Sequence, residues 1–128
     1  MMYKILFALT LLVGIFSCKH ADQDKFTNTH WVVTTINDST VSTNVGLYFE
    51  STSKMSFSQS ANSCGGNYSL SGDQLYIELE FCTEMCCDDE LSGKVDDILS
   101  PNTSLQYKIK EKELLLQGST GKLVLELQ

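Results

Sequence analysis

The sequence of 128 residues contains no arginine, and its nine lysines stand against sixteen acidic residues, which gives a net charge of −7. Proteins that bind nucleic acids need basic patches that contact phosphates, and arginine is favoured there because its planar guanidinium binds phosphate through two donors. We therefore expect no nucleic-acid partner. The excess of acid is best interpreted as a means of keeping the protein soluble at a cell surface.

Histidine is also scarce, and no catalytic arrangement surrounds the two that are present. His20 and His30 do not lie beside a serine or cysteine in a pattern that suggests a triad. Nucleophilic catalysis needs a base positioned next to the nucleophile. We therefore expect that the protein is not an enzyme, that it has no catalytic residues and that it needs no cofactor.

No apolar run reaches the length of about 20 residues that a permanent membrane-spanning helix needs. A shorter apolar run, residues 5–16, follows Lys4 and is typical of a secretory signal. It ends in GIFSC, which resembles a bacterial lipobox with Ser17 directly before Cys18. The resemblance implies cleavage before Cys18 and acylation of that residue, for example with palmitate. The alternative is an ordinary signal peptide cut at the same place. Such a cleavage site favours a small residue three positions before the cut, where this sequence has Ile15.

These features divide the chain into three parts. Residues 1–17 are predicted to be a lipoprotein signal peptide, and the polar residues 18–28 a flexible tether that carries the lipid. Residues 29–128 then form a single domain with one core. We expect the protein to be exported and held in the bacterial cell envelope, at the outer membrane, with the membrane as a partner through the lipid on Cys18.

From residue 29 onward, apolar and polar residues mostly alternate, which is typical of strands with one buried face. The alternation predicts strands within residues 30–36, 45–51, 54–59, 67–80, 104–110, 113–117 and 122–127, the fourth range being a hairpin. An antiparallel sheet of this kind has one wet face and must cover the other.

The pattern changes to a helical period at residues 88–100, before Pro101. Asp88 and Asp89 lie where an N-cap and first-turn acids belong, and Gly93 weakens the helix by roughly 1 kcal/mol relative to alanine. We therefore predict a mainly β fold: a strongly curved antiparallel sheet or an incompletely closed small barrel of about seven to eight strands, with one amphipathic helix packed on it. The apolar face of this helix is expected to consist of Leu91, Val95, Ile98 and Leu99.

Four cysteines remain once Cys18 is acylated: Cys64, Cys82, Cys86 and Cys87. An even number in an exported domain predicts two disulfides, and four cysteines allow three pairings. The pairing of 64 with 82 and 86 with 87 ranks last, because a bond between adjacent cysteines closes a small strained ring. A metal site that uses all four thiolates, for zinc or copper, is the alternative. It lacks the Cys-x-x-Cys spacing of common zinc sites.

Several motifs together resemble the META domain, the HslJ-like family of secreted and lipid-anchored bacterial proteins. Trp31 begins the first strand, CGGNYSLSGDQL forms a hairpin entry at residues 64–75, and TEMCCDDE precedes the helix at residues 83–90. The closing stretch, LQYKIKEKELLLQGSTGKLVLEL, is similar to the last strands of the family. The resemblance covers about 100 residues and implies a curved β fold with a helix, an envelope location and no established catalytic residues.

The same resemblance bears on the disulfides and on function. The family motif matches Cys64 and Cys87, which favours a bond between them and leaves Cys82 and Cys86 to close a local loop. Members are associated with stress responses. We therefore expect a non-enzymatic, lipid-anchored envelope protein with a binding or scaffold role linked to stress, whose protein partner is unknown. The alternatives are a cysteine-based metal-binding lipoprotein and a carrier of a small apolar ligand, whose pocket would be lined by Trp31, Phe57, Tyr68 and Tyr107.

Overall fold

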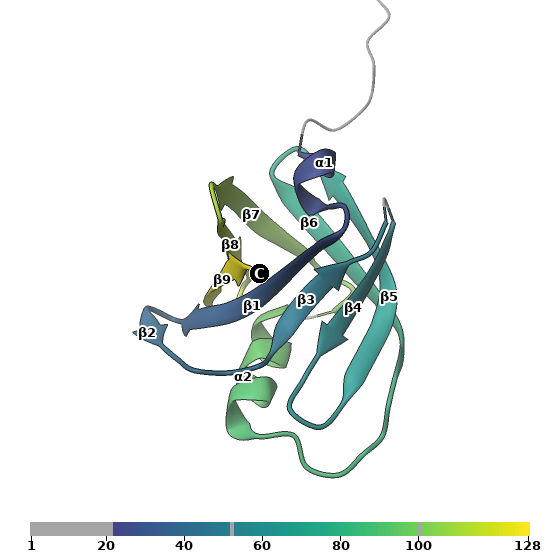
Figure 1. The fold of residues 1–128 in the computed structure, drawn as a ribbon, viewed down its shortest axis with the longest axis vertical. Coiled ribbons are helices and arrows are strands. Elements are labelled where there is room, and N and C mark those ends of the chain that lie inside the picture. Colours follow the sequence, from purple (N-terminus) through teal and green to yellow (C-terminus); the bar gives the residue numbers. More distant parts are fainter. Residues whose placement is uncertain (1–21, 52, 100) are drawn as a thin grey trace, which may run out of the picture.

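The computed structural model describes residues 22–51, 53–99 and 101–128, so the predicted signal peptide and Cys18 lie outside the described residues (Figure 1). Strands dominate this part of the chain. The helices are α1 (Gln23–Phe26) and α2 (Glu90–Leu99), and the strands are β1 (Thr29–Ile36), β2 (Ser39–Thr40), β3 (Gly46–Phe49), β4 (Lys54–Ser58), β5 (Ser63–Ser71), β6 (Gln74–Cys82), β7 (Ser104–Lys110), β8 (Glu113–Gln117) and β9 (Lys122–Leu127). Neither described helix is long and apolar enough to cross a membrane.

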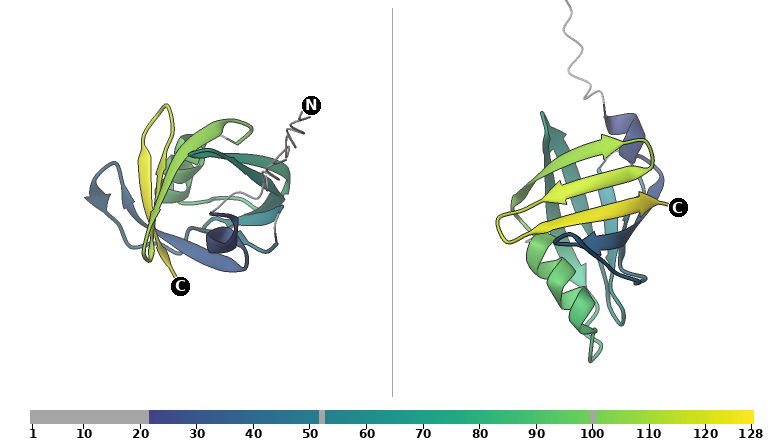
Figure 2. Two further views of the ribbon diagram at one scale, coloured as in Figure 1. Left: turned by 90° about the horizontal axis from the view of Figure 1, so that it is seen from above. Right: turned by 90° about the vertical axis from the view of Figure 1, so that its left-hand side faces the viewer.

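Eight of the strands form a closed antiparallel barrel. Neighbouring strands follow the order β1-β3-β4-β5-β6-β7-β8-β9, and β9 pairs back with β1 to complete the ring. The short β2 lies outside the ring and pairs only with β1. The predicted mainly β fold with a curved sheet and a packed helix is confirmed, and the closure between β1 and β9 makes the barrel complete (Figure 2).

The interior of the barrel is filled by the apolar rows that the sequence predicted. In β8 and β9 the alternation places Leu114, Leu116, Leu123 and Leu125 inside, where all four are fully buried. In β1 a register shift near Val33 interrupts the alternation. An eight-stranded barrel is just wide enough for side chains to fill it, so the core is packed and continuous.

The helix α2 lies at one end of the barrel, which we call the α2 end (Figure 1). Three of the four residues predicted for its apolar face, Val95, Ile98 and Leu99, are buried, while Leu91 is partly exposed. The last turn of α2 lies against the β8–β9 turn, where the carbonyl of Ile98 is so close to Gly118 that there is no room for a side chain there. The helix therefore packs on the barrel as expected and covers its mouth.

The opposite end, which we call the α1 end, corrects the predicted tether. Residues 18–28 are predicted to be flexible, but the described residues from 22 onward are docked onto the barrel. Phe26 is fully buried, and its ring packs edge-on against Phe49 and Tyr107 at centroid distances of 4.9 and 5.3 Å. The prediction is wrong here because a single apolar residue within a polar stretch produces no periodicity.

Candidate functional site

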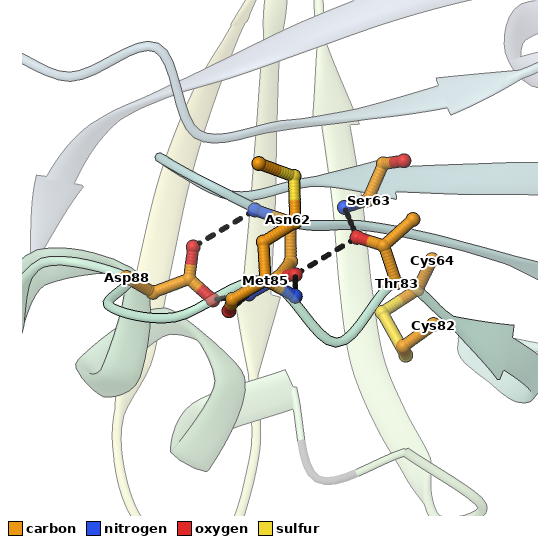
Figure 3. The surroundings of a disulfide bond; sticks show 7 residues. All are labelled: Asn62, Ser63, Cys64, Cys82, Thr83, Met85 and Asp88. Atoms are coloured by element: carbon orange, nitrogen blue, oxygen red, sulfur yellow. Dashed lines mark hydrogen bonds between the residues drawn. A yellow bond between two sulfur atoms is a disulfide. The ribbon is translucent and has the colours of Figure 1, made fainter.

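The cysteines and most of the polar contacts that connect distant segments gather at the α2 end. After β6 the chain forms a loop, residues 83–89, which we call the cysteine loop, and then enters α2. This loop lies beside the β4–β5 turn, residues 59–62 (Figure 3). The site therefore combines two segments that are more than 20 residues apart in sequence.

Cys64 forms a disulfide with Cys82, across the β5–β6 hairpin, with the two Cα atoms 4.0 Å apart. The expected bond from Cys64 to Cys87 is therefore wrong. The cause is a bulge in the hairpin, where Gly66 faces Leu79 but Gly65 faces residue 81. The extra residue shifts the register by one position, so that Cys82 and not its neighbour lies directly opposite Cys64.

The second disulfide joins Cys86 to Cys87 within the cysteine loop. The expected local bond from Cys82 to Cys86 is wrong, and the pairing that ranked last on the basis of ring strain is the one found. Cys87 has a φ of 85°, in the left-handed region that residues other than glycine seldom adopt. Both cysteines of this pair are exposed.

The four cysteines do not form the thiolate cluster that a metal site would need. Each is bonded to one other, and the two disulfides belong to different elements, one to the hairpin and one to the loop. Within residues 22–51, 53–99 and 101–128, no three histidine, cysteine, aspartate or glutamate side chains lie together in a way that could hold a metal ion.

Asn62 is the centre of the contact between the cysteine loop and the β4–β5 turn (Figure 3). Its Oδ1 accepts hydrogen bonds from the Met85 N–H at 2.7 Å and from the Thr83 hydroxyl at 2.8 Å. Its Nδ2 donates to the Met85 carbonyl at 2.9 Å and to Oδ2 of Asp88 at 2.7 Å. Because both ends of the amide are engaged, its orientation is fixed and it cannot flip.

Asp88, at the end of the cysteine loop next to α2, also binds the β4–β5 turn. Its Oδ1 accepts hydrogen bonds from the backbone N–H groups of Ala61 and Asn62, at 2.7 and 3.0 Å. The hydrogen bond from the Asn62 side chain, together with those from the backbone, holds the pKa of the Asp88 carboxyl below its usual range. This residue is predicted to help begin α2, and in the structure it connects the helix start to the turn.

Asp89 caps α2, as the sequence predicted for one of the two acids. Its Oδ1 accepts a hydrogen bond from the Ser92 N–H at 2.8 Å, and this bond lowers the pKa of the Asp89 carboxyl. Ser92 is fully buried, and its Oγ accepts a hydrogen bond from the Ser60 N–H at 3.0 Å. Ser60 in turn accepts a hydrogen bond from the Asp89 N–H at 2.7 Å, so the first turn of α2 is attached directly to the β4–β5 turn.

Two large apolar side chains are exposed beside this network. Phe81 on β6 is 66% exposed, and Met85 in the cysteine loop is 65% exposed. The Phe81 ring lies directly over Gly65 on β5, where any side chain larger than hydrogen would collide with it. The ring forms one wall of an open hollow of about 280 Å³ whose floor consists mainly of serine and glycine residues of β4 and β5. No pattern in the sequence indicates that Phe81 and Met85 are exposed or that Asn62 connects two segments.

Charge is concentrated in the same part of the molecule. Residues 74–100, which form β6, the cysteine loop and α2, contain eight carboxylates and one lysine, Lys94. The remainder of the chain from residue 18 onward contains eight carboxylates and seven lysines. Nearly all of the net negative charge of residues 18–128 therefore lies on this segment.

The four aromatic residues predicted to line a pocket lie in the packed core. Trp31, Phe57, Tyr68 and Tyr107 are all buried. Trp31 and Tyr107 touch two different open hollows, and Phe26 packs against Tyr68 and Tyr107 from the α1 end. Burial raises the pKa of the Tyr107 hydroxyl, which donates to Asp22. The structure therefore does not bring the four rings together around one pocket.

Comparisons with known proteins agree with this architecture. A model of the META domain family matches residues 24–128. A protein with a structure determined by NMR shares 17% identity, with 81% of this chain and 92% of that one covered and a TM-score of 0.66. A second NMR structure, of a protein from Burkholderia xenovorans, also shares 17% identity, with 84% and 87% covered and a TM-score of 0.58. At this identity the two structures show the fold alone. No curated protein matches the sequence.

Proposed function

This chain belongs to the META domain family, and we propose that it is an exported, lipid-anchored, non-enzymatic binding module of the bacterial cell envelope. In this proposal Cys18 carries the lipid, and the barrel holds a protein partner on its outer surface. The observation that carries the proposal is the filled interior of the barrel, because it leaves the outer surface as the place for an interaction. A link to the stress response, which the family resemblance suggests, is part of the same proposal.

Three features support a binding role at the α2 end. Phe81 and Met85 are large, apolar, exposed and close in sequence, on segments held rigidly by a disulfide and by the Asn62 network. Exposed aromatic and methionine side chains are enriched where proteins bind one another. Rigid support lowers the entropic cost of binding, because the surface is already ordered before the partner arrives.

The lipid anchor is supported by the GIFSC stretch and by the residues on its C-terminal side. The polar stretch after Cys18 leads directly into the folded domain, as expected for a lipoprotein whose mature chain begins at that cysteine. The two alternative functions receive less support from the site. A metal-binding lipoprotein would need free thiolates that converge, and a carrier of an apolar ligand would need a shared pocket between the aromatic rings.

The proposed binding surface can be tested by crosslinking in living cells of the source bacterium. A photoreactive phenylalanine analogue is placed at Phe81 in one strain and at Tyr48, a half-exposed residue on β3, in a control strain. We expect illumination to give a discrete crosslinked protein from position 81 and none from position 48. Equal yields at both positions, or no product from either, would refute a partner at the α2 end.

A further inference from the structure

We infer that the α1 end of the barrel rests on the membrane that holds the lipid, and that the cysteine loop and α2 face away from it. This orientation rests on the proposed acylation of Cys18. It deepens that proposal by assigning one end of the barrel to the lipid surface and leaving the other end for a partner.

The rigid domain begins at residue 22, close to the lipidated cysteine. Tyr107 donates its hydroxyl to Oδ2 of Asp22 at 2.8 Å, and Nε2 of Gln23 donates to the Tyr68 hydroxyl at 2.7 Å. Together with the buried ring of Phe26, these contacts fix the chain to the barrel from residue 22 onward. Only three residues, 19–21, separate Cys18 from this fixed point.

The connection to Cys18 is short compared with the barrel. Four peptide units fully extended span at most about 14 Å, whereas a nine-residue strand such as β6 is about 30 Å long. The connection therefore cannot pass from the α1 end to the far end of the barrel. Whatever conformation residues 19–21 adopt, Cys18 stays near the α1 end.

The surface near the lipid consists of α1 and the turns beside it. These turns lie next to α1, since the Tyr68 hydroxyl donates to the Ser51 carbonyl and the Tyr107 hydroxyl contacts the Gly72 carbonyl. Figures 1 and 2 show α1 and α2 at opposite ends of the molecule. The cysteine loop thus lies on the side away from the lipid.

Charge favours the same orientation. The carboxylates of residues 74–100 would be repelled by an anionic lipid surface, and Lys94 is the one lysine within that segment. Lys122, at the β8–β9 turn beside α2, forms an ion pair with Asp38 at 2.8 Å and adds no net positive charge there. At the α1 end, α1 and the β3–β4, β5–β6 and β7–β8 turns with their flanking residues carry both signs: Lys25, Lys54, Lys110 and Lys112, and Asp22, Asp24, Glu50, Asp73, Glu111 and Glu113. At physiological salt the repulsion acts within about 8 Å, so it resists any tilt that lowers α2 onto the surface.

The orientation can be tested with the mature acylated protein reconstituted into vesicles of phosphatidylethanolamine and phosphatidylglycerol that contain a lipid with a quencher on its head group. A fluorophore is attached to K112C, in the turn between β7 and β8 at the α1 end, or to G93C, in α2, where there is open space around the residue. The native disulfides stay oxidised, so only the introduced cysteine is labelled. We expect quenching several times stronger at position 112 than at position 93.

A second pair of variants carries a flexible Gly/Ser linker of about 20 residues between Ala21 and Asp22, with a root-mean-square length of about 25 Å. In these variants we expect quenching at position 112 to fall towards the weak level at position 93, because the long linker no longer holds the α1 end at the surface. Equal quenching with the native connection, or stronger quenching at position 93, would overturn the orientation while leaving the acylation intact. Protein that fails to float with the vesicles, and whose Cys18 also takes up the label, would overturn the acylation and the orientation together.

Discussion

Replacing Phe26 with alanine should destabilise the domain strongly, because this residue is part of the core and not part of a tether. Its side chain is fully buried, and it contacts Phe49, Tyr68 and Tyr107. Truncation removes the buried ring and leaves a cavity, because the surrounding strands are held in the ring of the barrel and cannot collapse into it.

The expected loss of unfolding free energy is about 3–5 kcal/mol, the range found for buried phenylalanines changed to alanine. Domains of this size are stable by about 5–15 kcal/mol, so the change removes a large share of the total. With a urea m-value of about 2 kcal/mol per M, the midpoint of unfolding should fall by about 2 M while the m-value stays unchanged.

The assay is urea unfolding of the isolated domain, residues 22–128, measured by the fluorescence of Trp31, the single tryptophan. Two variants serve as controls. Phe26→Leu should cost less than about 1.5 kcal/mol because it keeps most of the apolar volume. Lys25→Ala should cost less than about 1 kcal/mol because the Lys25 side chain, which pairs with Asp22, is exposed. A loss of less than about 1 kcal/mol for Phe26→Ala would show that α1 is not docked. The tether would then be long, and the orientation at the membrane would lose its basis.

Three further predictions concern the β5–β6 hairpin and the α2 end. Asp88→Asn should lower the free energy of unfolding at neutral pH. Because the pKa of Asp88 is depressed in the fold, the stability that its carboxylate contributes is complete above about pH 5 and is lost as the pH falls below about 4. The unfolding curves of wild type and variant should therefore converge in acid. Gly93→Ala should raise stability by about 0.5–1 kcal/mol, because alanine favours a helix more than glycine does and there is open space beside α2. Gly66→Ala should lower stability by about 1–3 kcal/mol or more, because a methyl group would collide with the backbone of β6. Both changes are measured by urea unfolding. Replacing Cys64 and Cys82 together by alanine should cost about 3 kcal/mol for a bridge over 18 residues, and peptide mapping of the oxidised protein should find these two linked.

Specific outcomes would contradict each of these. A constant difference between wild type and Asp88→Asn from pH 7 to pH 3 would show that the carboxylate is not held by the turn. Stabilisation by Gly66→Ala would show that β5 and β6 are not in close contact at the bulge. Cleavage after glutamate places Cys64, Cys82 and Cys87 in different peptides, and a peptide of Cys64 linked to that of Cys87 would show that the hairpin has a different register.

The fold is determined largely by patterns that act over short distances in the sequence. Alternation in residues 104–127 predicted β7, β8 and β9, because each residue there faces either the core or water. The spacing of Val95, Ile98 and Leu99 predicted the buried face of α2 for the same reason. Closure of the barrel between β1 and β9 could not be predicted, since it depends on pairing between opposite ends of the chain.

The site was less predictable because its contacts depend on register and on single polar residues. One extra residue at Glu80 decides whether Cys82 or Phe81 faces Cys64, and no local pattern marks the bulge. Asn62 lies in a turn and has no periodicity, so its bonds to Thr83 and Met85 are visible only in three dimensions.

The anchor is tested most directly by mass spectrometry of the intact protein extracted from membranes of the source bacterium. Acylation of Cys18 predicts a mature chain that begins at this residue and carries the additional mass of fatty acyl chains, all of it on the N-terminal peptide. A mature chain that begins elsewhere, or one that begins at Cys18 with an unmodified thiol, would contradict the lipid anchor and the function proposed from it.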